Sequence, residues 1–98
     1  MVLISDKVLN FAENRGFCGI VLKKEINKFG WAGCVDIIRG EFIKSEEEIN
    51  KDIFYNVEEY KNIKVFIPEN IDNSLEIRIK SNLSFFNMMI LSVEVFEK

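Results

Sequence analysis

Phe17-Cys18-Gly19-Ile20-Val21-Leu22 is the stretch that decides the fold, because each of its residues is apolar or glycine. A strand with one face in water alternates apolar and polar residues, whereas an unbroken apolar run is typical of a strand covered on both faces. We therefore expect a strand here that is buried on both sides. Residues 25–30, which follow, are interpreted as a turn.

The segment before this strand has the pattern of a helix. Ser5 and Asp6 are residues that cap helix N-termini, and Gly16 suits the left-handed stop at the other end. Between them lies an apolar stripe at helical spacing, made of Val8, Leu9, Phe11 and Ala12. The sequence thus predicts one N-terminal helix.

The residues after the turn predict mostly strands. Residues 35–43 form a second strand, which Gly40 interrupts with a bulge or an end of pairing. Ser45 and Glu48 have the spacing of a capping box, so a single helical turn is expected there. Residues 53–57 and 64–67 are short strands joined by the polar residues 58–62, and Pro68 ends the second one.

The C-terminal part predicts two further strands. Leu75, Ile77 and Ile79 alternate with charged residues, the period of two expected of a strand with one wet face. Residues 85–96 form a longer apolar stretch, whose second half again alternates and whose first half is apolar on both sides. The order is one helix and then mostly strands, so the fold class is α+β, mainly β.

Length and composition indicate one globular domain over residues 1–98. Two cores in 98 residues would each be too small, and a hydrophobic share of 48% with nine phenylalanines supplies one core. A net charge of −3 with scattered lysines argues against nucleic acid. No apolar run is long enough to span a bilayer and residues 1–4 are too short for a signal peptide, so we expect a cytoplasmic protein without membrane contact.

The chemistry-bearing residues are few. The chain contains no histidine, which removes Cys-His and Ser-His-Asp catalysis and every imidazole ligand, so we do not expect an enzyme. Its two cysteines, Cys18 and Cys34, are too few for a disulfide framework and would be free thiols in the cytosol. Cys34 follows a glycine, in a setting that can present sulfur to a metal or a partner.

Several features, in this order, resemble the HesB-like domain of A-type iron–sulfur carriers. They are the helix start at Ile4-Ser5-Asp6, the apolar strand after Gly16-Phe17, Gly33-Cys34, the strand Asn62-Ile63-Lys64-Val65-Phe66-Ile67-Pro68 and Leu75-Glu76-Ile77. Together they span nearly the whole chain. The resemblance implies a HesB-like domain of short strands with one N-terminal helix, and a role in assembling or delivering iron–sulfur clusters.

A closer likeness is to short relatives that carry a Cys-Cys or Cys-selenocysteine pair, with a tail similar to Phe85-Phe86-Asn87-Met88. Compared with both groups, this chain lacks some of the cysteines. A-type carriers use a Cys-x-Cys pair near the C-terminus, where this chain has Glu94-Val95-Phe96-Glu97-Lys98. The short relatives have a second cysteine or selenocysteine directly after the first, where this chain has Val35. Only Cys34 matches a ligand position of the family.

The ligand count restricts a metal site. A tetrahedral iron or zinc site needs four ligands, and one chain offers only the thiols of Cys34 and Cys18. An iron–sulfur cluster or iron ion would have to be shared across a homodimer, with two copies of Cys34 and with Cys18, Asp36 or glutathione completing the shell. Cys18 alone is more consistent with a small buried apolar residue. The cations nearest Cys34 in sequence are Lys28 and Arg39, which would lower the pKa of its thiol if they lay close to it.

Other residues suggest surfaces rather than chemistry. Candidates for an oligomer or partner interface are Trp31, Phe85, Phe86 and Met88. Aromatic residues with one exposed edge, such as Trp31, often anchor interfaces, and the stretch that contains the other three is apolar on both strand faces and so needs a second cover. A core role is the alternative for Trp31. The glutamates of residues 46–48 lack the spacing of a calcium loop and indicate a solvated acidic turn, and Glu58, Glu59 and Tyr60 indicate a loop.

Two hypotheses about function follow. The first is a divergent HesB-like protein linked to iron–sulfur or thiol chemistry through Cys34. The second is a binding or structural module that keeps the fold without a ligand and acts by protein–protein association.

Overall fold

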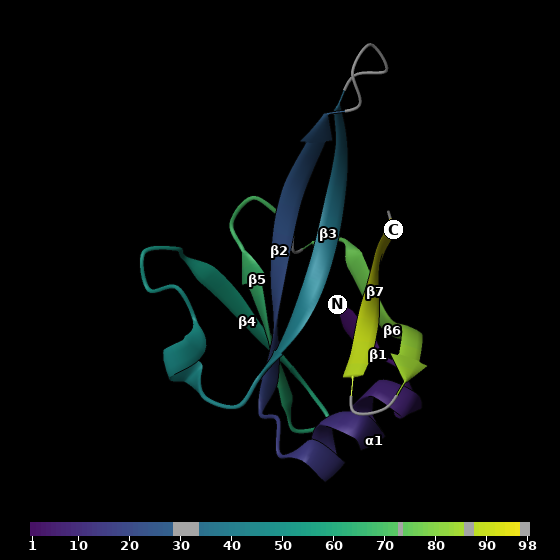
Figure 1. Ribbon diagram of the computed structural model, residues 1–98. Helices are drawn as coiled ribbons and strands as arrows, with labels where there is room; N and C mark the ends of the chain where they lie inside the picture. Colours follow the sequence, from purple (N-terminus) through teal and green to yellow (C-terminus); the bar gives the residue numbers. More distant parts are fainter. Residues whose placement is uncertain (29–33, 73, 86–87, 97–98) are drawn as a thin grey trace.

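The computed structural model describes residues 1–28, 34–72, 74–85 and 88–96, with side chains for all of these except 26–28, 34–36, 83–85 and 88 (Figure 1). The chain is mainly β with one α-helix, which confirms the α+β class and the N-terminal helix. The elements are β1 (Val2–Ile4), α1 (Asp6–Arg15), β2 (Gly19–Lys28), β3 (Cys34–Ile43), the short 3-10 helix η2 (Glu46–Glu48), β4 (Tyr55–Tyr60), β5 (Ile63–Pro68), β6 (Glu76–Phe85) and β7 (Met88–Phe96).

Helix α1 begins and ends where its sequence predicts. Gly16 adopts the left-handed conformation with φ of 73°, and its N–H donates to the carbonyl of Glu13 at 3.3 Å. Val8 and Ala12 turn inward and are buried. Ser5 occupies the N-cap position, but its side chain makes no capping hydrogen bond. Its Oγ is buried and has no hydrogen-bond partner in the described part of the chain.

Two sheets face each other. The first has the strand order β1-β6-β7 and the second the order β3-β2-β5-β4. Strand β1 pairs in parallel with β6, and β2 pairs in parallel with β5, whereas the remaining neighbours are antiparallel. Strand β1 was not predicted, since three residues of apolar sequence carry too little pattern to identify a strand.

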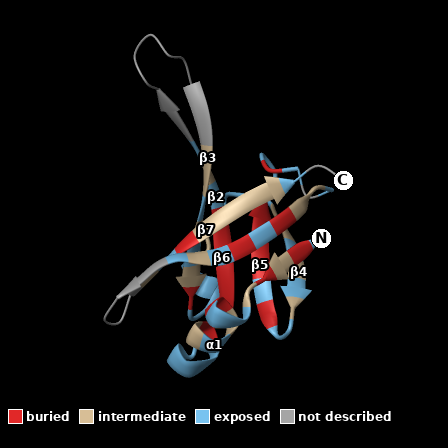
Figure 2. Ribbon diagram, turned by 90° about the vertical axis from the view of Figure 1, so that its right-hand side faces the viewer, coloured by how far each residue is buried: buried red, intermediate tan, exposed pale blue. Residues whose placement is uncertain are grey.

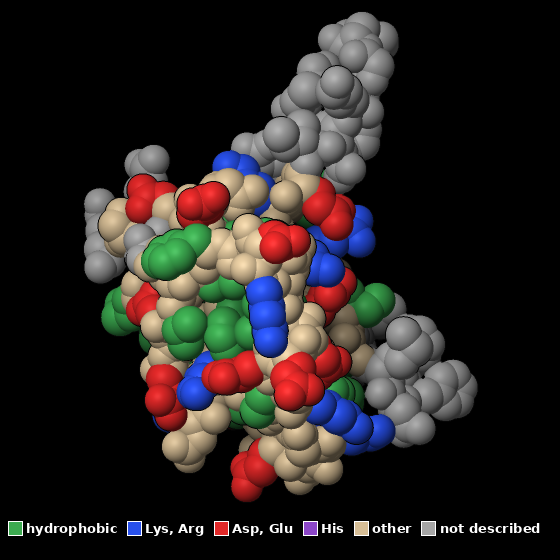
Figure 3. All heavy atoms as spheres, turned by 90° about the vertical axis from the view of Figure 1, so that its left-hand side faces the viewer, with side chains coloured by type: hydrophobic (Ala, Val, Ile, Leu, Met, Phe, Trp, Pro, Cys, Tyr) green, Lys and Arg blue, Asp and Glu red, His purple; other side chains and the backbone are tan. Residues whose placement is uncertain are grey.

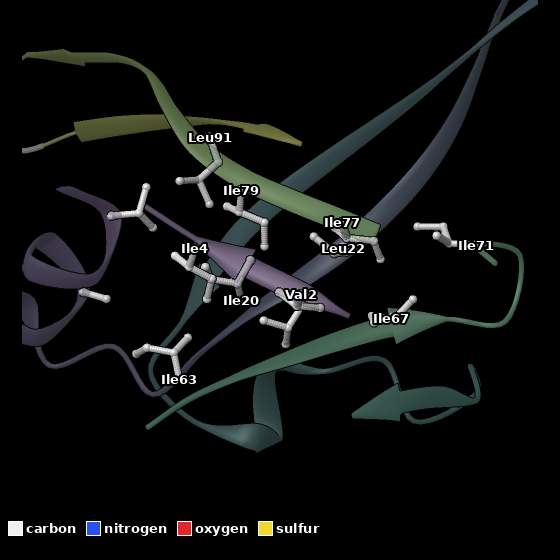
Figure 4. Packing of buried hydrophobic residues seen from close by; sticks show 13 residues of the cluster. Val2, Ile4, Ile20, Leu22, Ile63, Ile67, Ile71, Ile77, Ile79 and Leu91 are labelled. Carbon is white, nitrogen blue, oxygen red and sulfur yellow. The ribbon is translucent and has the colours of Figure 1, made fainter. Parts of the chain in front are cut away.

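The main core lies between the two sheets (Figures 2 and 4). Ile20 and Leu22 contribute from β2, and Ile77 and Ile79 contribute from β6 on the opposite side. All four side chains are fully buried. The alternation of Ile77 and Ile79 with charged residues therefore marks the wet-faced strand that the sequence predicts, and α1 closes the core at one end of the molecule (Figure 1).

Strands β2 and β3 form a long hairpin of ten consecutive residue pairs, from Gly19 opposite Ile43 to Lys28 opposite Cys34. The interpretation of residues 25–30 as a turn is wrong at its start, because β2 continues through Lys28. Polar residues stay in the strand here because cross-strand ion pairs stabilise them, between Lys23 and Glu41 at 3.0 Å and between Arg39 and Glu25 at 3.1 Å. The outer part of the hairpin extends beyond the two sheets (Figure 1).

The predicted bulge at Gly40 does not occur. Gly40 pairs with Leu22 in an unbroken ladder. A Cβ at this position would lie 3.3 Å from methyl groups of Leu91 and Val93, so the absent side chain lets β7 pack closely against β3.

The other two hairpins differ from their predictions in where they turn. Strands β4 and β5 are joined by Lys61 and Asn62, both with positive φ, so most of the segment predicted to connect them is strand. Pro68 ends β5 as predicted.

Residues 85–96 are not one strand, because Phe85 is the last residue of β6 and pairs with Met88 at the start of β7. Several strands are also nine or ten residues long, which differs from the expected domain of short strands.

Within the described residues, the structure contains no helix of the length and apolar character needed to cross a membrane.

Candidate functional site

The outer face of the four-stranded sheet, which points away from the main core, carries a second apolar cluster. Because side chains alternate along a strand, Val21 lies on the face opposite to Ile20 and Leu22. The register sets Val21 beside Phe66 of β5, and Phe66 beside Val57 of β4. Val21, Phe66 and Ile43 are buried together, and they are separate from the main core.

Gly19 allows this face to form. A Cβ at Gly19 would lie 2.7 Å from the carbonyl oxygen of Lys64 and 3.2 Å from the ring of Phe66. Only glycine therefore lets β5 approach β2 closely enough for the parallel pairing of Gly19 with Lys64. That pairing is what brings Phe66 beside Val21.

The segment between β3 and β4 crosses part of this face and leaves a groove. Ile49 and Tyr55 pack against the cluster, and Ile49 directly follows η2. The remaining space is an open groove of about 560 Å³ between β2, β3, the segment 48–55 and the segment 68–70. We call it the outer groove. Hydrophobic side chains gather between charged ones on this side of the molecule (Figure 3).

Exposed apolar side chains continue from the groove onto the surface. Ile53, which lines the groove, is 40% exposed, and the adjacent Phe54 is 67% exposed. Val57, on the outer face of β4, is 52% exposed. This surface was not predicted from the sequence, because residues 53–57 have the pattern of a strand. The available signal was two large apolar residues, Ile53 and Phe54, directly after the polar stretch Asn50-Lys51-Asp52.

A capping box holds the wall of the groove in place. The side chain of Ser45 accepts a hydrogen bond from the N–H of Glu47 at 3.2 Å, and Glu48 Oε2 accepts from the N–H of Ser45 at 2.9 Å. The single helical turn expected at Ser45 is thereby confirmed. Lys64 Nζ contacts Glu46 at 3.0 Å, and this hydrogen bond with Glu46 raises the pKa of Lys64 above its ordinary value.

The structure separates the two cysteines. Cys18 precedes β2 and is half-buried against the outer apolar cluster. Cys34 is the first residue of β3, opposite Lys28 at the far end of the hairpin. Lys28 lies nine residue steps along the strand from Gly19, which corresponds to about 30 Å. Cys18 and Cys34 of one chain therefore do not belong to a common site.

The residues of one chain do not fit an iron or iron–sulfur centre. Such a centre needs several thiolates close together, and the two cysteines lie at opposite ends of the hairpin. Asp36 pairs with Ile26 in the same outer part as Cys34. In the part of the chain whose side chains are described, no three His, Cys, Asp or Glu residues come together in an arrangement that could hold a metal ion.

The structure places only some of the other residues predicted to form a site or an interface. Phe85 and Met88 are paired in the backbone register at the end of the β6–β7 hairpin. Trp31 and Phe86 lie outside the described residues. Glu58 and Glu59 belong to β4 rather than to a loop, and Glu58 Oε2 is buried without a hydrogen-bond partner.

Comparisons with protein-family models, with curated proteins and with solved structures gave no match to this chain. The resemblance to the HesB-like domain therefore stays a prediction, and the outer groove has to be interpreted from its own geometry.

Proposed function

We propose that the protein is a binding module that acts by association with another protein, and that the outer groove receives a segment of that partner. The observation that supports this proposal is the exposed apolar surface beside the second cluster of Val21, Ile43 and Phe66. The cluster itself is buried on the sheet face opposite the main core, and the apolar surface continues from it through the outer groove to Ile53, Phe54 and Val57, which are exposed.

The shape of the apolar surface favours a peptide segment over a small molecule. The groove volume of about 560 Å³ is within the range of small-ligand pockets. However, Phe54 and Val57 extend the exposed apolar surface past the groove, where a compact ligand would leave them in water. Exposed apolar surface of this kind marks interaction sites in soluble proteins.

A peptide library displayed on phage tests the proposal, because the partner is unidentified. Peptides selected on the wild-type protein should bind at least tenfold more weakly to Ile53→Glu, which places a charge in the groove wall. Phe54→Glu, at a position that is 67% exposed, should weaken binding without any burden on folding. Circular dichroism establishes that both variants are folded.

The matched control is Ile90→Glu on β7. Ile90 is the same residue type at a similar exposure, 46% against 40% for Ile53, but it lies on the other sheet. It should bind the selected peptides like the wild type. If Ile53→Glu and Phe54→Glu bound them as well as Ile90→Glu does, the groove would not be the binding site and the proposal would fail.

A second candidate function is thiol or iron–sulfur chemistry at Cys34, shared between two copies of the chain. The backbone register supports it by pairing Cys34 with Lys28 in the outer part of the β2–β3 hairpin. Since one chain does not fit a cluster, this function requires a homodimer with Cys34 from both copies.

Anaerobic reconstitution with iron and sulfide tests this candidate. The wild type should give a coloured, metal-containing dimer, and Cys34→Ser should lose both the colour and the metal. Cys18→Ser is the control and should retain them, because Cys18 lies about 30 Å away along the hairpin. An uncoloured, metal-free wild type would rule out the cluster.

A further inference from the structure

The charges around the outer groove define which partner segment it would accept. We infer that the segment is basic and apolar, with an apolar centre and a lysine or arginine on each side. This inference rests on the proposed function and adds the chemistry of the partner to it.

The lining of the groove carries an excess of negative charge. Four carboxylates, those of Glu25, Glu41, Glu48 and Glu69, stand against the ammonium groups of Lys23 and Lys24. Two of these carboxylates are already neutralised, since Glu41 pairs with Lys23 and Glu25 pairs with Arg39. Lys24 donates a hydrogen bond to the backbone carbonyl of Asn70 at 3.2 Å.

In the described part of the chain, Glu48 and Glu69 are the two lining carboxylates that no ion pair neutralises. Within the described residues, neither carboxylate forms an ion pair with a lysine or arginine. Glu48 Oε2 accepts hydrogen bonds from the N–H groups of Lys44 and Ser45, which fixes the side chain while leaving its negative charge uncompensated by a cation. Glu69 is exposed and directly follows β5.

The two carboxylates belong to opposite ends of the groove. Glu48 accepts a hydrogen bond from the N–H of Lys44, which directly follows Ile43. Ile43 pairs with Gly19, so Glu48 belongs to the end of the groove at the start of β2. Glu69 is adjacent to Asn70, which Lys24 contacts. From Gly19 to Lys24 is five strand residues, or roughly 17 Å. An extended peptide would span this length with cations about five residues apart.

The apolar cluster lies between these ends. Val21 is on β2 between Gly19 and Lys24, and Ile53 and Tyr55 line the groove from the other side. An apolar side chain in the middle of the partner segment would therefore meet apolar surface, while its flanking cations would reach Glu48 and Glu69. Exposed ion pairs are individually weak, so the two together should strengthen binding roughly threefold to tenfold at low salt.

Three synthetic peptides test the inference by fluorescence anisotropy. All three peptides have a central leucine and two variable positions, one on each side of it and five residues apart. These two positions are both lysine in the first peptide, both serine in the second and both glutamate in the third. The lysine peptide should bind most tightly, and its advantage over the serine peptide should shrink as salt is added. The double variant Glu48→Gln and Glu69→Gln should remove that advantage. The amide that Glu48→Gln introduces retains an oxygen that can accept the capping hydrogen bonds.

The control for net charge is Glu13→Gln together with Glu47→Gln, because both carboxylates are exposed and neither lines the groove. This pair should leave the lysine preference unchanged. If the glutamate peptide bound as tightly as the lysine peptide, or if both double variants behaved alike, the inference would be overturned. The proposed function would still stand if Ile53→Glu abolished the binding of all three peptides. Binding that Ile53→Glu leaves unchanged, or no binding of any peptide, would overturn both.

Discussion

Gly19→Ala should destabilise the protein far more than the same substitution at Gly40. The added methyl group at Gly19 would lie 2.7 Å from the carbonyl oxygen of Lys64, closer than real Cβ atoms approach. That oxygen belongs to the backbone of β5, next to the bond from Lys64 N–H to the carbonyl of Cys18 at 3.2 Å. The strands must therefore separate, because a backbone atom cannot rotate out of the way.

The magnitude follows from two opposing terms. Inserting a methyl group into packed structure costs about 1–3 kcal/mol. Replacing glycine by alanine returns about 0.4–1 kcal/mol by restricting the unfolded chain. The net loss in the free energy of unfolding is about 1–2 kcal/mol, or a decrease of roughly 5–15 °C in Tm for a domain of this size.

At Gly40 the same methyl group meets only side chains. Its nearest neighbours are methyl groups of Leu91 and Val93 at 3.3 Å, which can move by a few tenths of an ångström. The gain from restricting the unfolded chain offsets that cost, so Gly40→Ala should stay within about 0.5 kcal/mol of the wild type.

Urea unfolding followed by far-ultraviolet circular dichroism measures both variants against the wild type. If Gly19→Ala were as stable as the wild type, or if the two variants lost equal stability, the close approach of β5 to β2 at Gly19 would be refuted. The packing that brings Phe66 beside Val21 would then need another explanation.

Three further outcomes are expected. Ile79→Ala should cost about 2–5 kcal/mol in chemical unfolding because Ile79 is fully buried, whereas Ile90→Ala at a 46% exposed site should stay within about 0.5 kcal/mol, and equal effects would contradict the assigned core. Ser45→Ala removes one acceptor of the capping box and should lower stability by about 1 kcal/mol in the same assay, so an unchanged midpoint would show that the turn does not depend on it. The hydroxyl and N–H of Ser74 hold the pKa of Asp72 below its ordinary value, so the folded state gains stability above the ordinary carboxyl pKa and loses it as the pH falls through the lowered one. Ser74→Ala should move the pKa of Asp72 up towards its ordinary value in a carboxyl NMR titration, and an unmoved titration would show that Ser74 is not the cause.

Elements encoded by local patterns were predicted well. The helix has an apolar stripe and ends at Gly16, and it forms with nearly the predicted bounds, although the side chain of Ser5 makes no capping hydrogen bond. Ser45 and Glu48 predicted their turn in the same way. These signals succeed because the interactions that they describe join residues three or four positions apart.

Elements whose stability comes from distant partners were predicted poorly. Lys23, Lys24 and Glu25 have the composition of a turn, but pairing with β3 keeps them in a strand. Gly40 by itself indicates an interrupted strand, but in the structure its missing side chain leaves room for Leu91 and Val93 of β7. Lys61 takes a positive φ that its sequence does not favour, because the hairpin needs it.

The same distinction between local patterns and distant contacts applies to the candidate site residues. Cys34 could be singled out from sequence because cysteine, glycine and the absence of histidine are properties of composition and local order. The distance between Cys34 and Cys18 could not be predicted from the sequence, because that distance depends on the register of the β2–β3 hairpin. The outer groove was missed for the same reason, since Val21, Ile53 and Phe66 are far apart along the chain.

The sequence alone was sufficient to establish the α+β class, mainly β, with an N-terminal helix and an apolar strand covered on both faces. Hydrophobic periodicity and capping residues carry that information locally. Only the tertiary structure decided what covers the second face of that strand. On one side the main core buries Ile20 and Leu22, and on the other Val21 is buried with Ile43 and Phe66, with Ile49 and Tyr55 packed against them. Local sequence patterns do not reveal these partners, because strand register and the approach of β5 at Gly19 are set by contacts between residues distant in sequence.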